Sequence, residues 1–254
     1  MIRRSRTSPS SWPLLKEYGF GATFFITEVA SISKKNKNRL TTWEEIAELH
    51  QDGFEIGNHT RDHLGISDAN VPQLMEQLTG IAERCAQYGI PKPVTFAWPG
   101  NATSLKAFSV LEEHGILFAR RGGAPEYPYE EGRGFAFQPG HDHPLLLPSA
   151  GDARPNWTLP SFIQAVQQAK DGRVAILQFH GVPDTAHDWV STQQQNFEAY
   201  MKYLKLNNFQ VIALRDLARY RGTTFKPNDP LQVVHQRQKQ LKAAAQQSSE
   251  NGEQ

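Results

Sequence analysis

The chain has 254 residues, a length that suits one large α/β domain or two small ones. It carries 27 Lys and Arg against 26 Asp and Glu, for a formal net charge of +1. This balance argues against a dedicated nucleic-acid binder, which usually has a strongly basic face. The single cysteine, Cys85, excludes an intrachain disulfide framework and a cysteine-based zinc knuckle, and we expect it to be inert core.

No membrane association is expected, because no apolar run in the sequence approaches the length of a membrane span. The N-terminus begins with basic residues but has no apolar region of the kind that a signal peptide contains. As written, the sequence indicates a cytoplasmic protein, and the localisation stays open because an incomplete N-terminus is an alternative.

Helix and strand patterns alternate along the body of the chain, from residue 12 to about residue 220. Helices are predicted at 12–18, 42–52, 72–88, 103–114, 158–170, 192–205 and 214–220. Strands are predicted at 22–26, 54–57, 94–97, 116–119, 173–179 and 209–213. The stretch 121–156 is rich in Gly and Pro and is predicted to be irregular, as long functional or disordered loops often are.

Six strands, each preceded by a helix, predict an α/β fold with a parallel sheet and right-handed crossovers. Since the sequence contains neither a GxGxxG motif nor a P-loop, a (β/α) barrel is favoured over the doubly wound nucleotide-binding folds. We divide the chain into an irregular N-terminus (1–11), the folded domain (12–222) and a polar tail (223–254). Within the tail, 231–247 has the composition of a helix, and the rest is expected to be poorly ordered.

Chemically active residues fall just after several of the predicted strands, where the active sites of (β/α) barrels are built. The first candidates are His59 and His63, which can meet one metal ion if the segment is helical or tightly turned. Zn²⁺, Co²⁺ or Ni²⁺ would suit two imidazoles, with Asp62 as a further ligand or an orienting group. The alternative is two solvated loop histidines, and two histidines do not complete a catalytic zinc site.

His180 follows the strongly apolar strand at 173–179 and is a candidate general acid. The alternative is a structural histidine that bonds a backbone carbonyl. Trp98, beside Pro99, and Trp157 are candidates for stacking on a sugar ring, although either could simply pack in the core. The His141-Asp142-His143 segment could form a metal pair, but its proline and glycine neighbours favour an ordinary loop.

Three stretches of the chain resemble a known family. The segment LLKEYGFGATFF (14–25) resembles a helix-strand signature, His59 to His63 matches the metal motif H-[ST]-x-x-H, and Leu177 to His180 resembles a late L-x-x-H motif. Together these stretches are similar to the polysaccharide deacetylases of carbohydrate esterase family four, the NodB homology domain. The resemblance covers roughly residues 12–220.

This resemblance implies a distorted (β/α)7 TIM-like barrel that removes acetyl groups from sugars, a hydrolase acting on carbon–nitrogen (non-peptide) or ester bonds. It implies a divalent metal, most often zinc, held by His59 and His63, and His180 as the catalytic acid. Trp98, Pro99 and Trp157 would lie in the substrate-binding region. The implied partner is an acetylated polysaccharide or oligosaccharide, with no nucleic acid and no membrane.

The chain departs from the family pattern in three places. The opening T-F-D-D-G motif, whose aspartates supply the base and the third metal ligand, is absent, and with it the expected first strand. The family's R-x-P motif is replaced by Ala97-Trp98-Pro99, and its D-x-x-D-W motif has only a loose candidate between Asp152 and Trp157. These departures predict weak or absent activity, and they suggest a truncated or frame-shifted product, a true pseudoenzyme, or assembly with another segment.

Two other functions stay open at this level. The chain could be a non-catalytic carbohydrate-binding relative, with Trp98 and Trp157 forming a platform for a sugar. It could also be another metal-dependent C–N hydrolase on a similar barrel.

Overall fold

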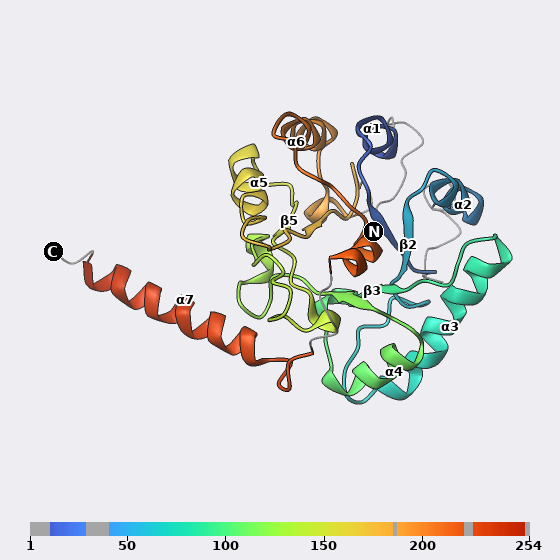
Figure 1. The fold of residues 1–254 in the computed structure, drawn as a ribbon, viewed down its shortest axis with the longest axis horizontal. Helices are drawn as coiled ribbons and strands as arrows, with labels where there is room; N and C mark the ends of the chain where they lie inside the picture. Colours follow the sequence, from blue (N-terminus) through green and yellow to red (C-terminus); the bar gives the residue numbers. More distant parts are fainter. Residues whose placement is uncertain (1–10, 29–40, 185–186, 221–225, 252–254) are drawn as a thin grey trace.

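A computed structural model describes residues 11–28, 41–184, 187–220 and 226–251. Short strands form the middle of the molecule and helices surround them, while one long helix projects outward (Figure 1). The strands are β1 (Thr23–Ile26), β2 (Glu55–Asn58), β3 (Thr95–Ala97), β4 (Phe118–Arg120), β5 (Gly151–Asp152) and β6 (Leu177–Gln178). The α-helices are α1 (Ser11–Tyr18), α2 (Trp43–Gln51), α3 (Val71–Gln87), α4 (Phe108–Glu113), α5 (Leu159–Val166), α6 (Gln194–Leu206) and α7 (Gln232–Asn251).

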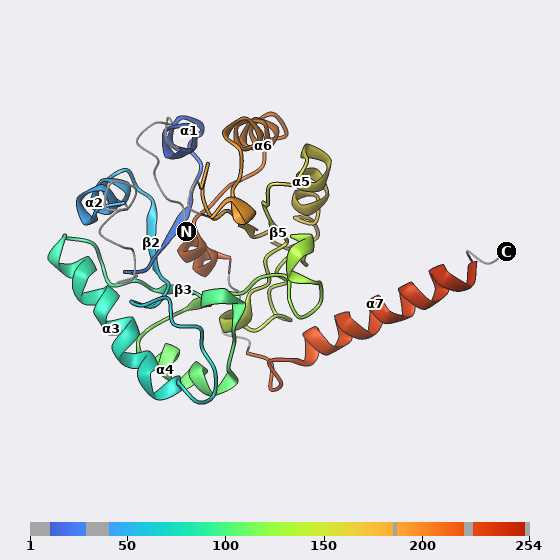
Figure 2. The same cartoon turned by 180° about the vertical axis from the view of Figure 1, so that it is seen from behind.

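All the strand pairs in the described part of the chain are parallel, so the α/β fold with a parallel sheet is confirmed. One sheet has the order β1-β2-β3-β4, and a second has the order β5-β6. A parallel bridge between Arg120 and Leu147 continues the strand arrangement beyond β4. The view from behind shows the same ring of helices α1 to α6 around the strands (Figure 2).

Helices α2 and α3 begin where the sequence signals predict. Thr42 and Glu45 form a complete capping box at the start of α2. Pro72 lies in the first turn of α3, and Leu74, Leu78 and Ile81 on its inner face are fully buried. The helical periodicity of 72–88 therefore corresponds to the packed face of α3.

Glu55 joins the start of the four-stranded sheet to the end of the domain. This buried carboxylate accepts hydrogen bonds from Thr23 Oγ1 (2.5 Å), Thr95 Oγ1 (2.8 Å) and the backbone N–H of Arg215 (2.8 Å). Burial raises the pKa of Glu55 despite these donors. The residue ties β1, β2 and β3 to the segment after α6, which is a structural role that the sequence did not reveal.

Two strand predictions were wrong in extent. Of the predicted strand 173–179, only Leu177–Gln178 forms a strand, and 209–213 has no regular secondary structure. Both segments are apolar and prone to form strands, but a strand also needs a neighbour whose backbone groups can pair with its own. The predicted helix 103–114 is also shorter, because α4 begins at Phe108 after a 3-10 turn.

The C-terminal tail forms α7, which covers the helix predicted at 231–247 and projects away from the body in both views (Figures 1 and 2). Its first turns are anchored, since Val234 and Arg237 are buried. Arg237 donates to both oxygens of Asp142 (2.7 and 2.8 Å) and lies 3.6 Å from Glu126, which is itself paired with Arg121. A buried ionic network therefore fixes the start of this helix to the long loop.

Candidate functional site

The ends of the parallel strands bring distant residues to one rim of the sheet. His59 directly follows β2, Arg120 ends β4, Asp152 ends β5 and His180 comes two residues after β6. Because parallel strands end on the same side, these residues share the rim where (β/α) barrels build their active sites. The expected convergence at the strand ends is therefore present for His59 and His180, and Arg120 and Asp152 lie at the same rim.

The two histidines of the predicted metal motif lie side by side. The ring centroids of His59 and His63 are 4.8 Å apart at an interplanar angle of 79°. Thr60 and His63 both have positive φ values (59° and 54°), so the segment is a tight turn and not a helix. This turn achieves the proximity that a helical i, i+4 spacing would otherwise give.

His59 is held as a neutral imidazole with a fixed tautomer. Its Nδ1 lies 2.7 Å from the carbonyl oxygen of Ala97, so Nδ1 carries the proton and Nε2 keeps its lone pair. Burial, together with the neighbouring His63, holds the pKa of His59 well below its usual range. A neutral imidazole with a fixed tautomer is the form that binds a metal ion.

The residues that the structure describes supply only two ligands for such an ion. No cluster of three or more His, Cys, Asp or Glu side chains suited to a metal occurs among them. Asp62, the expected further ligand, is instead bonded by Arg61 Nη2 (2.9 Å) and Gln77 Nε2 (2.8 Å). Within the described residues, the donor set for a metal ion therefore consists of His59 and His63.

A second pair of residues joins the ends of β5 and β6. His180 Nε2 lies 3.6 Å from Asp152 Oδ1, an oxygen that is buried and makes no hydrogen bond within the described structure. Arg154 donates to the other oxygen of Asp152 at 3.1 Å. Burial lowers the pKa of His180, and the Asp152 carboxylate opposes this effect by favouring the charged imidazolium.

Arg120 acts electrostatically on both histidine groups. Its buried guanidinium donates to Gln178 Oε1 and lies 5.7 Å from the centre of the Phe25 ring, and burial lowers its pKa to about 10. The charge of Arg120 lowers the pKa of both His59 and His180. Gln178 also contacts His180 Nε2 at 2.8 Å and so connects Arg120 to the candidate acid.

Comparison with known proteins places this arrangement in context. Residues 4–119 match the family model of polysaccharide deacetylase. The predicted resemblance to the polysaccharide deacetylase family is confirmed. A search of curated proteins gives no match.

Solved structures share the fold of this deacetylase-like chain. A family 4 acetyl xylan esterase from Clostridium thermocellum, in complex with a cobalt ion, has a TM-score of 0.54 at 16% identity, covering 87% of each chain. The Xyl-CE4 domain of a multidomain xylanase from the hindgut metagenome of Trinervitermes trinervoides has a TM-score of 0.53 at 14% identity, covering 88% of each chain. A family 4 carbohydrate esterase from Streptomyces lividans, in complex with acetate, has a TM-score of 0.51 at 17% identity, covering 82% of this chain and 86% of its own.

The aromatic residues expected to bind substrate are buried in the deacetylase-like domain. Trp98 is 1% exposed, and its Nε1 donates to the carbonyl oxygen of Leu145 at 2.9 Å. Pro99, which follows it, is also buried. Trp157 is 6% exposed and packs edge-on against Phe162 and Tyr200. In this structure neither indole is free to stack on a sugar, which corresponds to the core alternative considered for both.

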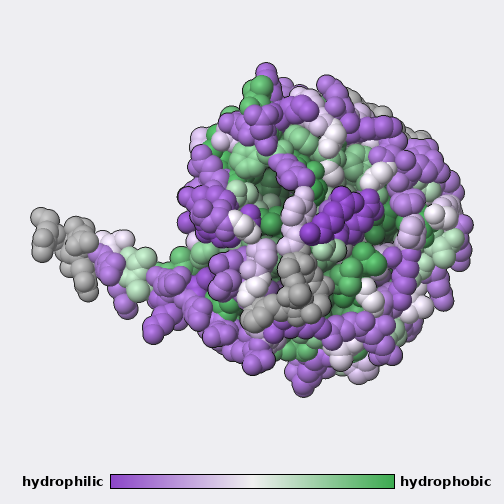
Figure 3. Space-filling model, viewed as in Figure 1, coloured by the Kyte–Doolittle hydropathy of each residue, from purple (hydrophilic) through white to green (hydrophobic). Residues whose placement is uncertain are grey.

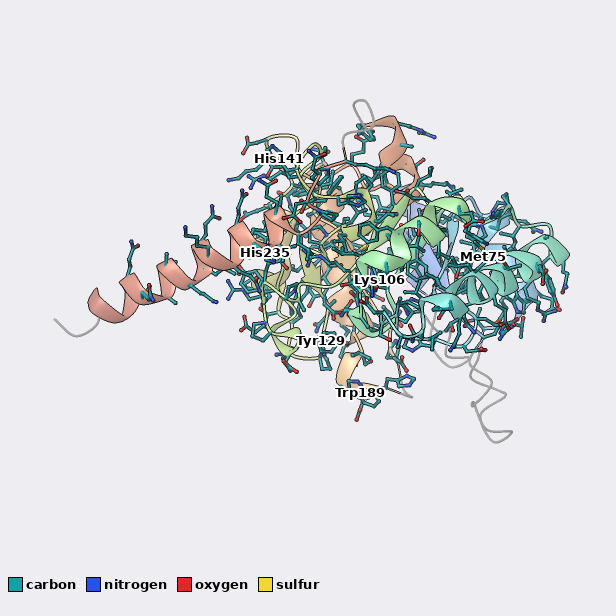
Figure 4. The ribbon with its side chains drawn as sticks, turned by 90° about the horizontal axis from the view of Figure 1, so that it is seen from below. Met75, Lys106, Tyr129, His141, Trp189 and His235 are labelled. Carbon is teal, nitrogen blue, oxygen red and sulfur yellow. The ribbon has the colours of Figure 1, made fainter. Side chains whose placement is uncertain are left out.

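The histidines of the His141-Asp142-His143 segment do not form a metal pair. His143 is buried, stacks on Phe108 with a centroid distance of 4.7 Å, and accepts the backbone N–H of Leu145 at its Nδ1 (3.1 Å). His141 is exposed and lies at the edge of the molecule opposite Tyr129 and Trp189 (Figure 4). Asp142 is bonded to Arg237, so each residue of the segment has a structural position.

Because His143 is buried, we expect acid to destabilise the fold. Burial lowers the pKa of His143 to about 4 from an ordinary value of 6.5, so the neutral form stabilises the fold above pH 6.5 and this contribution is lost as the pH falls toward 4. The free energy of unfolding should therefore fall between pH 7 and pH 4.5. We expect this fall to be smaller in His143→Asn, which keeps a side-chain acceptor, by roughly 2 kcal/mol. Urea denaturation at both pH values measures it, with His141→Asn as the exposed control. An equal acid loss in both variants would contradict the prediction.

Asp152 is predicted to set the proton affinity of His180. Replacing Asp152 by Asn removes the nearby negative charge that favours the imidazolium, so we expect the pKa of His180 to fall further. Side-chain NMR titration of the histidines measures this change. Asp184→Asn is the matched control, because Asp184 pairs with His187 (3.2 Å) instead. An unchanged His180 titration in Asp152→Asn would show that the pair is not coupled.

Cys85 is fully buried, and burial raises the pKa of its thiol to about 12, as expected for an inert core residue. No helix in the described part of the chain is both long and apolar enough to span a membrane.

Proposed function

We propose that this chain is a metal-dependent deacetylase-type hydrolase of acetylated sugars, with zinc as the metal and a reduced activity. The observation that carries the proposal is the meeting of two separate groups at one rim: the neutral His59–His63 pair and the Asp152–His180 pair, with Arg120 acting on both. The family match and the fold of the esterases described above support the same reaction class.

Each group has a distinct part in acetyl hydrolysis. His59 and His63 would hold the ion, which when bound polarises the acetyl carbonyl and acidifies a water molecule. His180 would donate a proton to the departing sugar nitrogen or oxygen as its bond to the acetyl carbon breaks. Asp152 would stabilise the protonated form of His180 before that transfer.

The described part of this site has no evident catalytic base. A water molecule that attacks the acetyl carbon must lose a proton, and the side chains described around His59 and His63 include no carboxylate gathered with them. For this reason we expect the metal-loaded chain alone to release acetate slowly or not at all. A soluble carboxylate such as formate should raise the rate, because it can take the proton.

Acetate release from N-acetylglucosamine oligomers and from acetylated xylan oligomers tests the proposal. The tag-free chain is assayed with Zn²⁺ or Co²⁺, with EDTA, and with added formate, beside His59→Ala. We expect slow, metal-dependent release that formate accelerates and His59→Ala abolishes. Release that survives both EDTA and His59→Ala would overturn the metal mechanism. Rapid acetate release without formate would contradict the proposal that the site lacks a catalytic base.

A carbohydrate-binding relative without catalysis gains no support from the aromatic residues proposed for it, because Trp98 and Trp157 are both buried. If neither metal nor formate produces acetate, glycan binding that survives chelation would favour that relative. Hydrolysis of small cyclic amides instead of acetylated sugars would favour another C–N hydrolase.

A further inference from the structure

Two exposed aromatic residues lie near the carboxyl ends of β5 and β6. Among the described residues, the exposed Phe, Trp and Tyr residues are Tyr129 (39%), Trp189 (61%) and Tyr220 (51%). Tyr129 and Trp189 lie at one edge of the molecule in the view from below (Figure 4). Tyr220 follows the 3-10 helix Leu214–Arg219, which lies toward the opposite edge, on the face that Figure 3 shows. Tyr129 and Trp189 therefore share a side of the molecule that Tyr220 does not.

Tyr129 is tied to the carboxylate that pairs with the candidate acid. The guanidinium carbon of Arg154 lies 3.8 Å from the centre of the Tyr129 ring, and Arg154 also donates to Asp152 Oδ2 at 3.1 Å. The carbonyl oxygen of Gly132, three residues after Tyr129, accepts the backbone N–H of Asp152 at 2.9 Å. The Arg154 contact covers one face of the Tyr129 ring and fixes its orientation. Tyr129 therefore has a fixed position beside the Asp152–His180 pair.

Trp189 lies on the loop that follows β6, and this loop is anchored to both strand ends. A parallel bridge joins Gly181 to Ser191, two residues after Trp189. Thr192 donates its backbone N–H to the carbonyl oxygen of Gly181 (2.9 Å) and its hydroxyl to the carbonyl oxygen of Ala153 (2.8 Å). Because Ala153 directly follows β5, these bonds hold the Trp189 loop beside the residues that carry the candidate acid and its carboxylate.

The chemistry of the two side chains suits a sugar ring. Single exposed aromatic residues are ordinary on protein surfaces, so the position of this pair, from two loops that bond to the same strand ends, carries the argument. Trp and Tyr combine a flat apolar face with a polar N–H or O–H group. A pyranose ring has an apolar C–H face and hydroxyl groups around its edge, so it can stack on the aromatic ring and bond to the polar group. Both side chains are also stiff, so little conformational entropy is lost on binding.

We propose that Trp189 and Tyr129 form a binding site for the sugar rings that adjoin the acetylated sugar, so that the chain binds oligosaccharides in preference to single sugars. The sugar that loses its acetyl group would lie beside His180, and the next rings of the same oligosaccharide would stack on Trp189 and contact Tyr129. The choice of a sugar as the ligand rests on the proposed hydrolase function, whereas the position of the site rests on the two anchored loops.

Isothermal titration calorimetry of the full, tag-free chain in EDTA tests the inference without catalysis. The ligands are a six-ring N-acetylglucosamine oligomer, a six-ring acetylated xylan oligomer and the single sugar N-acetylglucosamine. We expect one of the oligomers to bind at least tenfold more tightly than the single sugar, and the tighter oligomer identifies the preferred sugar. Trp189→Ala should weaken oligomer binding at least about tenfold and Tyr129→Ala at least about threefold. Trp189→Phe should keep much of the affinity, because it keeps an aromatic face.

Tyr220→Ala is the matched control, since it removes an exposed aromatic ring on the other side of the molecule and should leave oligomer binding unchanged. Circular dichroism and thermal unfolding confirm that each variant is folded. Absence of oligomer binding by the unaltered chain, equal binding of oligomers and single sugar, or full binding by a folded Trp189→Ala would each overturn the proposal. Oligomer binding that depends on Trp189 without any acetate release would overturn the hydrolase function alone, and acetate release from oligomers that is insensitive to Trp189→Ala would overturn this binding site alone.

Discussion

Replacing Asp142 by Ala is expected to lower the free energy of unfolding by about 3–5 kcal/mol. The substitution leaves the buried guanidinium of Arg237 without its two short bonds to the carboxylate. Glu126, 3.6 Å away, cannot replace them fully because it already pairs with Arg121 at 2.7 Å. Urea denaturation followed by circular dichroism measures the loss, which should also free the first turns of α7.

An exposed ion pair is the matched control for this network. Lys226 and Glu112 are 2.5 Å apart, but their side chains are 46% and 42% exposed, so Lys226→Ala should cost less than about 1 kcal/mol. Replacing both buried partners, in Asp142→Leu with Arg237→Met, should recover most of the stability because no unpaired charge remains. If Asp142→Ala costs no more than Lys226→Ala, the network does not hold the tail.

His180→Ala is expected to reduce the metal-dependent rate of acetate release by roughly 100-fold to 10,000-fold, the usual range for a lost general acid. The reason is that His180 lies near the rim, two residues after β6, and its Nε2 is 3.6 Å from the buried carboxylate of Asp152. The measurement is initial-rate acetate release with formate present, so that a base is supplied in every reaction. Metal binding should be unchanged, since His180 lies outside the histidine pair.

His187 provides the control for that loss. It forms a similar pair with Asp184 at 3.2 Å on the loop that follows β6, but it is more exposed than His180. His187→Ala should keep most of the rate. Equal rates in the two variants, both near that of the unaltered chain, would show that His180 is not the acid.

The fold was predictable where the signals are local. The capping box of Thr42 and Glu45 and the buried stripe from Leu74 to Ile81 depend only on neighbouring residues and the helical period. The strands at 173–179 and 209–213 depend on partners far along the chain, so their apolar sequences alone overestimated them. The burial of Arg237 was likewise invisible, because its partner Asp142 is 95 residues away.

The candidate site, like the fold, could be predicted from the sequence only in part. His59 and His63 could be found from their spacing, and His180 from its position after an apolar run, and the structure places all three at the strand ends. Asp152 was noticed only as part of a loose motif, since nothing in the sequence shows that β5 and β6 pair and bring it to His180. The indole of Trp98 could face a pocket or the core equally well on sequence grounds, and only packing decides between them.

The central claim is that His59 and His63 form one metal site, and Co²⁺ titration of the tag-free chain, followed by visible absorption, tests it most directly. We predict that one Co²⁺ binds, that His59→Ala and His63→Ala each weaken binding at least about tenfold, and that the exposed His141→Ala has no effect. Absence of binding by the unaltered chain, or equal binding by all three variants, would contradict the account.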